Sequence, residues 1–231
     1  MTIDSQRLQR LAEMGIVSWQ PRQSKSTSPE STIPVASASE SHEPSVLSSD
    51  IETLRAQVRD CQQCELHHSR TQTVFGSGSL KAKLFIIGEA PGADEDASGE
   101  PFVGRAGKLL NSMLEAIGLQ RDEVYIANIL KCRPPGNRDP KPEEVAECSG
   151  YLDRQINLVA PQLILAIGRV AAQNLLGVST PIGKLRGGEY QHPGSSIPVL
   201  ITYHPAYLLR SPREKRKAWD DLKQVALALG I

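Results

Sequence analysis

Residues 83–92 read KLFIIGEAPG, an apolar run that ends in a turn of glycine and proline. A short, continuous apolar run bounded by turn residues is typical of a strand buried on both faces. The glycines and the proline allow the backbone to turn sharply and to approach a ligand closely. The turn lacks the Gly-Lys-Ser/Thr ending of a P-loop. Taken alone, it fits an ordinary connection from a strand to a helix equally well.

The same apolar pattern recurs at residues 124–130, 163–168 and 198–203. Between these runs, residues 104–118, 142–160, 169–177 and 213–229 carry apolar residues at helical spacing. Alternating strands and helices predict an α/β fold, a three-layer α/β/α sandwich around a central four-stranded parallel sheet. Ligands of such sheets bind at the carboxyl ends of the strands, which is where the turn at 88–92 is expected.

The chain divides into segments of different character. Residues 51–231 are expected to form the folded domain, beginning with a helix at 51–60. Residues 23–50 are rich in Ser, Pro, Thr and Glu and lack periodicity, which predicts a disordered linker. Residues 1–22 contain a short amphipathic patch, which is interpreted as a docking peptide, with a loosely associated helix as the alternative.

The chain of 231 residues has no net charge, but its first 50 residues are acidic in balance, so the remainder is weakly basic. The neutral total disfavours a protein that coats DNA without specificity, whereas a local basic patch is enough to hold phosphates. No run is long and apolar enough for a membrane span, and no apolar segment follows a basic start. We therefore expect a cytoplasmic protein without a membrane partner.

Polar residues follow two of the predicted strands. Asn128 lies within an apolar run and needs hydrogen bonds, either from the neighbouring backbone or from a ligand. A carboxamide offers an acceptor and a donor side by side, so it can distinguish ligands that present opposite hydrogen-bonding patterns. His204, fixed by Pro205, follows the last strand. A single histidine is often structural, and the basic run at 210–217 is either a solvated helix face or a phosphate contact.

The chain has four cysteines, Cys61, Cys64, Cys132 and Cys148. Structural disulfides are rare in cytosolic proteins, so a metal or cluster site is the leading interpretation. Four thiolates suit either zinc or a [4Fe–4S] cluster. The second C-x-x-C pair of a zinc ribbon is missing, although His67 and His68 lie close to the first pair in the sequence.

Taken together, the motifs resemble the family 4 uracil-DNA glycosylases, the iron–sulfur branch of that superfamily. The matching segments are GEAPG at Gly88, PFVGRAG at Pro101, NILKCRPPGNR at Asn128, HPAYLLR at His204 and the four cysteines. The resemblance covers residues 51–231. It implies a uracil-DNA glycosylase-like fold, monofunctional hydrolysis of the N-glycosidic bond of uracil in DNA, and a structural [4Fe–4S] cluster on the four cysteines.

The resemblance also implies roles for individual residues. The uracil site would comprise Gly88, Glu89, Ala90, Glu95, Phe102, Asn128 and His204. Phe102 would stack on the flipped base, although ordinary core packing is an alternative. His204 would stabilise the uracil anion, with Glu89 and Asn137 as further catalytic candidates, and the residue that orients the water stays open. Contacts to DNA would come from Leu208, Leu209, Arg210 and Arg213, in part as a loop that enters the duplex.

Residues 14–22 resemble the peptide of the clamp-loader psi subunit that binds the chi subunit of the bacterial polymerase III. The resemblance implies a tether to the replication machinery, with chance similarity as the alternative. Two other functions compete with the enzyme: a module that binds uracil or abasic DNA without turnover, and an electron-transfer protein. The segment KCRPPGNRDP contains no histidine that could trap the product covalently, and electron transfer leaves the strand-end loops without a purpose.

Overall fold

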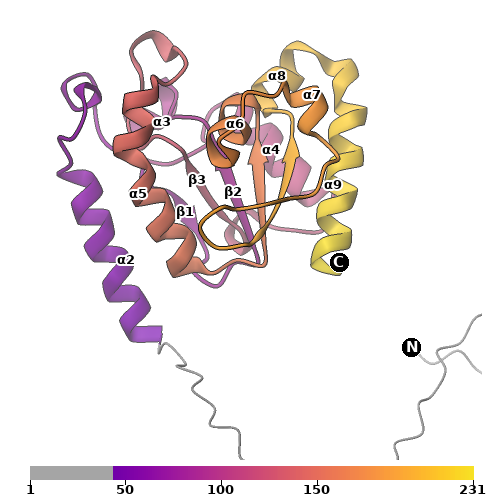
Figure 1. The fold of residues 1–231 in the computed structure, drawn as a ribbon, viewed down its shortest axis with the longest axis horizontal. Helices are drawn as coiled ribbons and strands as arrows, with labels where there is room; N and C mark the ends of the chain where they lie inside the picture. Colours follow the sequence, from indigo (N-terminus) through magenta and orange to yellow (C-terminus); the bar gives the residue numbers. More distant parts are fainter. Residues whose placement is uncertain (1–43) are drawn as a thin grey trace, which may run out of the picture. The chain divides into compact units, whose positions relative to one another are not determined.

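The fold was analysed in a computed structural model that describes residues 44–231 (Figure 1). The predicted docking peptide at 1–22, and the linker up to residue 43, lie outside the described residues. The chi contact that depends on this peptide therefore stays a prediction.

Four parallel strands form the centre of the sheet, in the order β3-β2-β4-β6. They are β2 (Leu84–Gly88), β3 (Tyr125–Asn128), β4 (Leu163–Ile167) and β6 (Pro198–Thr202). Every residue of β2, β3 and β4 is buried, which explains why these strands read as continuous apolar runs. The four-stranded parallel core predicted from the sequence is confirmed.

Two short antiparallel strands extend this core to a mixed sheet of six strands. The strand β1 (Ser77–Gly78) pairs with β3, and β5 (Tyr190–Gln191) pairs with β6. At Gly78, which has a φ of +126°, a Cβ atom would lie 1.9 Å from the carbonyl oxygen of Val124. The sequence did not predict these edges, because two residues are too few to show a strand pattern.

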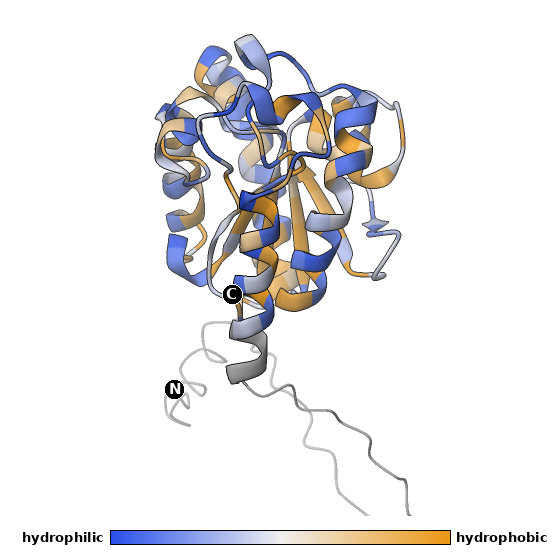
Figure 2. Ribbon diagram, turned by 90° about the vertical axis from the view of Figure 1, so that its left-hand side faces the viewer, coloured by the Kyte–Doolittle hydropathy of each residue, from blue (hydrophilic) through white to orange (hydrophobic). Residues whose placement is uncertain are grey.

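Helices cover both faces of the sheet and complete the three predicted layers. One face is covered by α5 (Pro142–Val159), α6 (Arg169–Leu176) and α7 (Ile182–Leu185), and the other by α4 (Arg105–Glu115), α8 (Pro205–Arg210) and α9 (Lys215–Leu229). Successive residues of β2 alternate between these two cores: Phe85 belongs to the first and Ile86 to the second. Figure 2 shows the apolar strands between helices whose hydrophilic residues face outward.

The helix α2 (Pro44–Arg59) begins earlier than the predicted residue 51 and occupies the end of the predicted linker. Its residues Ile51, Leu54 and Val58 form a small core with Phe75, against which Tyr151 of α5 packs. Figure 1 shows α2 and α5 side by side. Proline is well tolerated in a first helical turn, so the Pro- and Ser-rich composition at residues 44–50 did not prevent helix formation.

The remaining elements are short. They are α3 (Ala93–Ser98) and the 3₁₀ turns η1 (Glu65–His68), η2 (Arg121–Glu123), η3 (Pro135–Asn137) and η4 (Pro212–Glu214). None of the helices in residues 44–231 combines the length and the apolar character that a membrane span requires.

A buried ion pair ties α9 to the end of α7 and to the last strand. Arg186 donates to Asp221 through Nε (2.7 Å to Oδ2) and through a terminal nitrogen (2.8 Å to Oδ1). Thr202, the last residue of β6, donates its hydroxyl to the same carboxylate at 2.6 Å. Since Thr202 lies two residues before His204, this cluster fixes the end of the strand that leads into the predicted site.

We expect Asp221→Ala to lower the free energy of unfolding by about 3 kcal/mol, because it leaves the Arg186 guanidinium buried and unpaired. Urea-induced unfolding of the two proteins measures this difference. The neighbouring Asp220 forms an exposed pair with Lys223, so Asp220→Ala should change stability by less than about 1 kcal/mol. Equal effects of the two substitutions would contradict a structural role for the buried pair.

Candidate active site

A cavity of about 450 Å³ lies at the carboxyl ends of the central strands. It is lined by Glu89, Ala90, Pro91, Gly92, Glu95, Phe102, Ala106, Asn128, Pro134, Asn137, Arg138, Asp139, His204, Ala206, Tyr207 and Arg210. The cavity thus brings together segments that follow β2, β3 and β6. The lining includes every residue that was predicted to bind the base, with the exception of Gly88. Gly88 lies behind Asn128 and Phe102.

Gly88 creates the space for the polar and aromatic side chains of this cavity. It pairs with Asn128 in the parallel ladder between β2 and β3. A Cβ atom at residue 88 would lie 2.3 Å from Oδ1 of Asn128 and 2.6 Å from the tip of the Phe102 ring. These distances are below van der Waals contact, so glycine is required here for close packing.

Asn128 carries an unsatisfied acceptor. Its side chain is 1% exposed, and among the described residues its Oδ1 is the buried side-chain atom without a hydrogen-bond partner. A buried acceptor of this kind costs free energy unless a partner arrives. Because Asn128 lines the cavity, a ligand that donates a hydrogen bond would satisfy it.

Phe102 belongs both to the cavity and to the core, so the two alternatives that the sequence left open coexist. The ring is 7% exposed and packs within the core on the α4 side of the sheet. Its backbone has a φ of +55°, which is uncommon for a bulky residue. The Arg121 guanidinium holds the loop in this conformation through the carbonyl oxygens of Pro101 and Phe102.

His204 caps the N-terminus of α8 and lies near Phe102, with 5.6 Å between the two ring centroids. Its Nδ1 accepts a hydrogen bond from the backbone N–H of Ala206 at 3.1 Å. Burial, together with the positive charge of Arg210, lowers the pKa of His204 to about 4. At neutral pH the ring is therefore uncharged, and since Nδ1 accepts, the remaining proton lies on Nε2 as a donor.

Glu89 is a carboxyl group of the cavity with a strongly shifted pKa. Burial, with a smaller contribution from the charge of Asp139, raises the pKa of Glu89 to about 7. Arg169, which forms an ion pair with Asp139, acts in the opposite direction. Near neutral pH the group therefore exists in both forms, which suits a residue that exchanges protons.

Glu95 and Asn137 occupy supporting positions. Both carboxylate oxygens of Glu95 accept backbone hydrogen bonds, from Gly92 at 3.1 Å and from Val103 and Gly104 at 3.0 and 3.2 Å. Glu95 thus fastens the turn at 88–92 to the loop that carries Phe102. Asn137 is exposed at the rim of the cavity, where its Oδ1 accepts a hydrogen bond from Arg133 at 2.7 Å.

The segment expected to enter DNA as a loop is instead the short helix α8, which begins directly after His204. Leu208 is fully buried against α4 and α9, so it is a core residue and not an apolar wedge. Leu209 is half-buried, and Arg210 and Arg213 are exposed. Residues three apart share a face of a helix, so Leu208 faces inward together with the buried Pro205.

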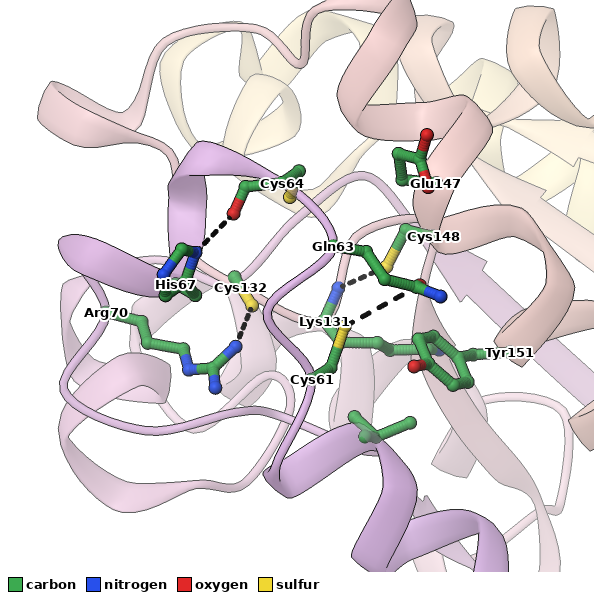
Figure 3. A pocket seen from close by; sticks show the side chains of 11 residues that line it. Cys61, Gln63, Cys64, His67, Arg70, Lys131, Cys132, Glu147, Cys148 and Tyr151 are labelled. Atoms are coloured by element: carbon green, nitrogen blue, oxygen red, sulfur yellow. Dashed lines mark hydrogen bonds between the residues drawn. The ribbon is translucent and has the colours of Figure 1, made fainter.

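The four cysteines surround a second cavity, which Figure 3 shows from close by. Cys61 and Cys64 lie between α2 and η1, Cys132 follows β3, and Cys148 belongs to α5. All four are free thiols. Two of the sulfurs accept hydrogen bonds: that of Cys132 from Arg70 at 3.2 Å, and that of Cys148 from the backbone N–H of Lys131 at 3.3 Å.

Several residues near the two cavities were not singled out from the sequence. Arg138 and Asp139 line the first cavity, and the fully buried Lys131 reaches the second. Arg138 is half-buried and Asp139 exposed, whereas the burial of Lys131 had no signal in the sequence, because lysine is almost never fully buried.

The model of the uracil DNA glycosylase superfamily matches residues 75–223 of this chain. The chain is 46% identical to a type-4 uracil-DNA glycosylase of Archaeoglobus fulgidus, over 75% of this chain and 90% of that protein. It is 42% identical to a type-4 enzyme of Sulfurisphaera tokodaii, over 76% and 83% of the two chains. A type-4 enzyme of Thermotoga maritima is 43% identical, over 70% and 84%. The chain therefore belongs to the uracil-DNA glycosylase superfamily.

Proposed function

We propose that this chain is a monofunctional uracil-DNA glycosylase of the type-4 branch, which hydrolyses the N-glycosidic bond of uracil in DNA and leaves an abasic site. The observation that carries the proposal is the cavity in which the unsatisfied acceptor of Asn128, the Phe102 ring and the neutral His204 ring come together. The names of the relatives, type-4 uracil-DNA glycosylases, agree with it.

Base selection is assigned to Asn128. Its free Oδ1 would accept N3–H of uracil, and its amide nitrogen would donate to O4. Cytosine has an acceptor at N3 and a donor at N4, so both pairings would fail. Phe102 would stack on the extruded base and replace part of the stacking lost from the duplex.

Bond cleavage is assigned to His204. As the N-glycosidic bond breaks, negative charge develops on uracil, and Nε2–H of the neutral ring would donate to O2. The hydrogen bond from Ala206 to Nδ1 keeps the proton on Nε2 without any rearrangement during the reaction. Water then attacks C1′ of the sugar, which gives the abasic site and free uracil.

Glu89 is assigned as the carboxylate that assists this reaction. It would either accept a proton from the attacking water or stabilise the positive charge that develops on the sugar. Because its pKa is about 7, kcat/KM should fall roughly tenfold for each pH unit below 7. His204, with its pKa of about 4, stays neutral over that range.

We expect Glu89→Gln to lower kcat/KM at pH 8 by about 100-fold and to abolish the dependence on pH. Initial rates at substrate concentrations far below KM, between about pH 5.5 and 8.5, give kcat/KM and so measure both effects. The exposed Glu100 provides the control, since Glu100→Gln should keep the full profile. A Glu89→Gln variant that keeps the wild-type kcat/KM at pH 8 would exclude the carboxylate role of Glu89.

Contacts to DNA are assigned to the surface beside the cavity. Arg210 and Arg213 are exposed there and suit phosphate contacts. With Leu208 in the core, Leu209 is the apolar residue of this segment that a duplex would meet.

The four cysteines are proposed to hold a [4Fe–4S] cluster. No three His, Cys, Asp or Glu side chains in residues 49–231 meet at a common point that would suit a single metal ion. Four free thiols surround one cavity and supply the four thiolate ligands that a [4Fe–4S] cluster requires, and two of the sulfurs accept N–H donors. When bound, the cluster would link the segment after α2, the turn after β3 and α5, and hydrolysis requires no electrons from it.

Cys132→Ser should lower the iron content, because Cys132 is the most buried member of the set, 7% exposed. Analysis of protein produced with iron and sulfide should give about four of each per wild-type chain. One zinc ion per chain without sulfide would contradict the assignment.

A gel assay tests the proposed activity. Cluster-loaded protein is incubated with an oligonucleotide that contains a single uracil, and the product is then treated with alkali. A cleaved strand that appears only after alkali is the expected result, because an abasic site breaks under alkali. An intact strand would refute the enzyme and would leave a binding module as the alternative.

The chi subunit of the clamp loader is proposed as a partner of residues 14–22, on the resemblance of that peptide alone. A pull-down with chi tests this contact: Trp19→Ala should abolish it, and an unchanged pull-down would refute it.

A further inference from the structure

Lys131 occupies an unusual place for a lysine. It follows the end of β3, it is 1% exposed, and it lines the cavity of the four cysteines. Lysine side chains are almost never fully buried unless they are paired. None of the ion pairs in the described part of the chain involves Lys131. Its burial therefore needs another explanation.

The side chain of Lys131 makes two specific hydrogen bonds. Its Nζ donates to the backbone carbonyl of Asn128 at 2.9 Å and to Oε1 of Gln155 at 2.6 Å. Gln155, itself fully buried, donates in turn to the carbonyl of Phe75 and to the hydroxyl of Tyr125. The ammonium group is thus held at a fixed point, directly under the backbone of Asn128.

The backbone of Lys131 faces the other cavity. Its N–H donates to the sulfur of Cys148 at 3.3 Å, and the next residue is Cys132. One residue therefore contacts a cysteine through its main chain, as Figure 3 shows, and the strand end at Asn128 through its side chain.

We propose that Lys131 is a positioning residue for uracil recognition, which fixes the backbone of Asn128 and connects it to the cysteine cavity. This inference rests on the proposed function. The Asn128 carboxamide must meet two atoms of the base at once, and small displacements of positioned groups cost much of their effect. By holding the carbonyl at the root of that side chain, Lys131 limits such displacements.

The variant Lys131→Met tests the inference, because it removes the donor and keeps a long, unbranched stem. We expect the affinity for free uracil, measured by calorimetry, to fall about tenfold, in line with the loss of a hydrogen bond from a charged group. The affinity for an oligonucleotide with an abasic site should stay within about twofold, and the iron content should not change, because the backbone bond to Cys148 remains. The exposed Lys83 provides the control, and Lys83→Met should change none of these values.

A double-mutant cycle shows whether Lys131 acts through Asn128. Starting from Asn128→Ala, the further change Lys131→Met should alter uracil affinity by less than about twofold, since coupled residues are not additive. A full tenfold loss in that background, or an unchanged affinity of the single variant, would overturn the inference.

If Lys131→Met does not fold, Gln155→Met removes one of the two acceptors of Nζ and should weaken uracil binding about threefold in the same assay. No change would then overturn the inference. The proposed function is judged separately, because it fails only if the wild-type protein releases no uracil from DNA.

Discussion

Replacing His204 by alanine is expected to lower the single-turnover rate of uracil release by about 100- to 1000-fold, the usual cost of removing a donor that meets developing negative charge. His204 lines the cavity, and its pKa of about 4 keeps the ring neutral. Because Nδ1 accepts a hydrogen bond, the one ring N–H is on Nε2. Alanine lacks this donor, and the rest of the site is left in place. Quenched-flow or manual sampling of product formation, with enzyme in excess, measures the rate.

His192 offers a control for this substitution. It is also a buried histidine, 5% exposed, but it lies beside the hairpin of β5 and β6 and contacts Ser195. His192→Gln should keep the rate within about threefold of the wild-type rate. His204→Ala and His192→Gln should both keep the iron content of the wild type. A rate of His204→Ala close to that of the wild type would remove His204 from the reaction.

The second large effect is expected at Asn128. In Asn128→Asp, a carboxylate replaces the amide donor, so O4 of uracil would face a negative charge. Uracil release should fall about 100-fold, equivalent to roughly 3 kcal/mol in the transition state. A protonated aspartic acid offers a donor to N3 and an acceptor to N4–H of cytosine, so the ratio of cytosine to uracil release should rise.

Paired oligonucleotides that differ only in uracil or cytosine measure this ratio. Asn111, which contacts Arg121 away from the base, is the matched control, and Asn111→Asp should leave the preference for uracil unchanged. If Asn128→Asp keeps the wild-type ratio, base selection does not depend on Asn128.

The central strands were predictable because burial on both faces makes the sequence itself apolar. Leu84–Gly88 and Leu163–Ile167 show this directly. The edges were not predictable, since β1 and β5 have two residues each and depend on pairing with distant segments. The helix α8 was missed because its six residues, which begin with Pro205, are too few to show periodicity. As a result, Leu208 was expected at the surface instead of in the core.

The cavity residues were predictable as a set through their motifs, but their physical roles were not. The sequence gives no sign that Glu95 holds the backbone of residues 103 and 104, nor that Oδ1 of Asn128 lacks a partner. The bond between Lys131 and Gln155 joins residues far apart in the chain, and no local pattern indicates it. Such contacts depend on tertiary packing and become visible only in the folded chain.

Mass spectrometry of the reaction products tests the central claim most directly. Cluster-loaded protein is mixed with an oligonucleotide that contains one uracil, and the strand is weighed before and after the reaction. Hydrolysis of the N-glycosidic bond predicts an intact abasic strand, lighter by uracil and heavier by water, together with free uracil in equal amount. An unchanged strand, or a strand attached covalently to the protein, would contradict the account.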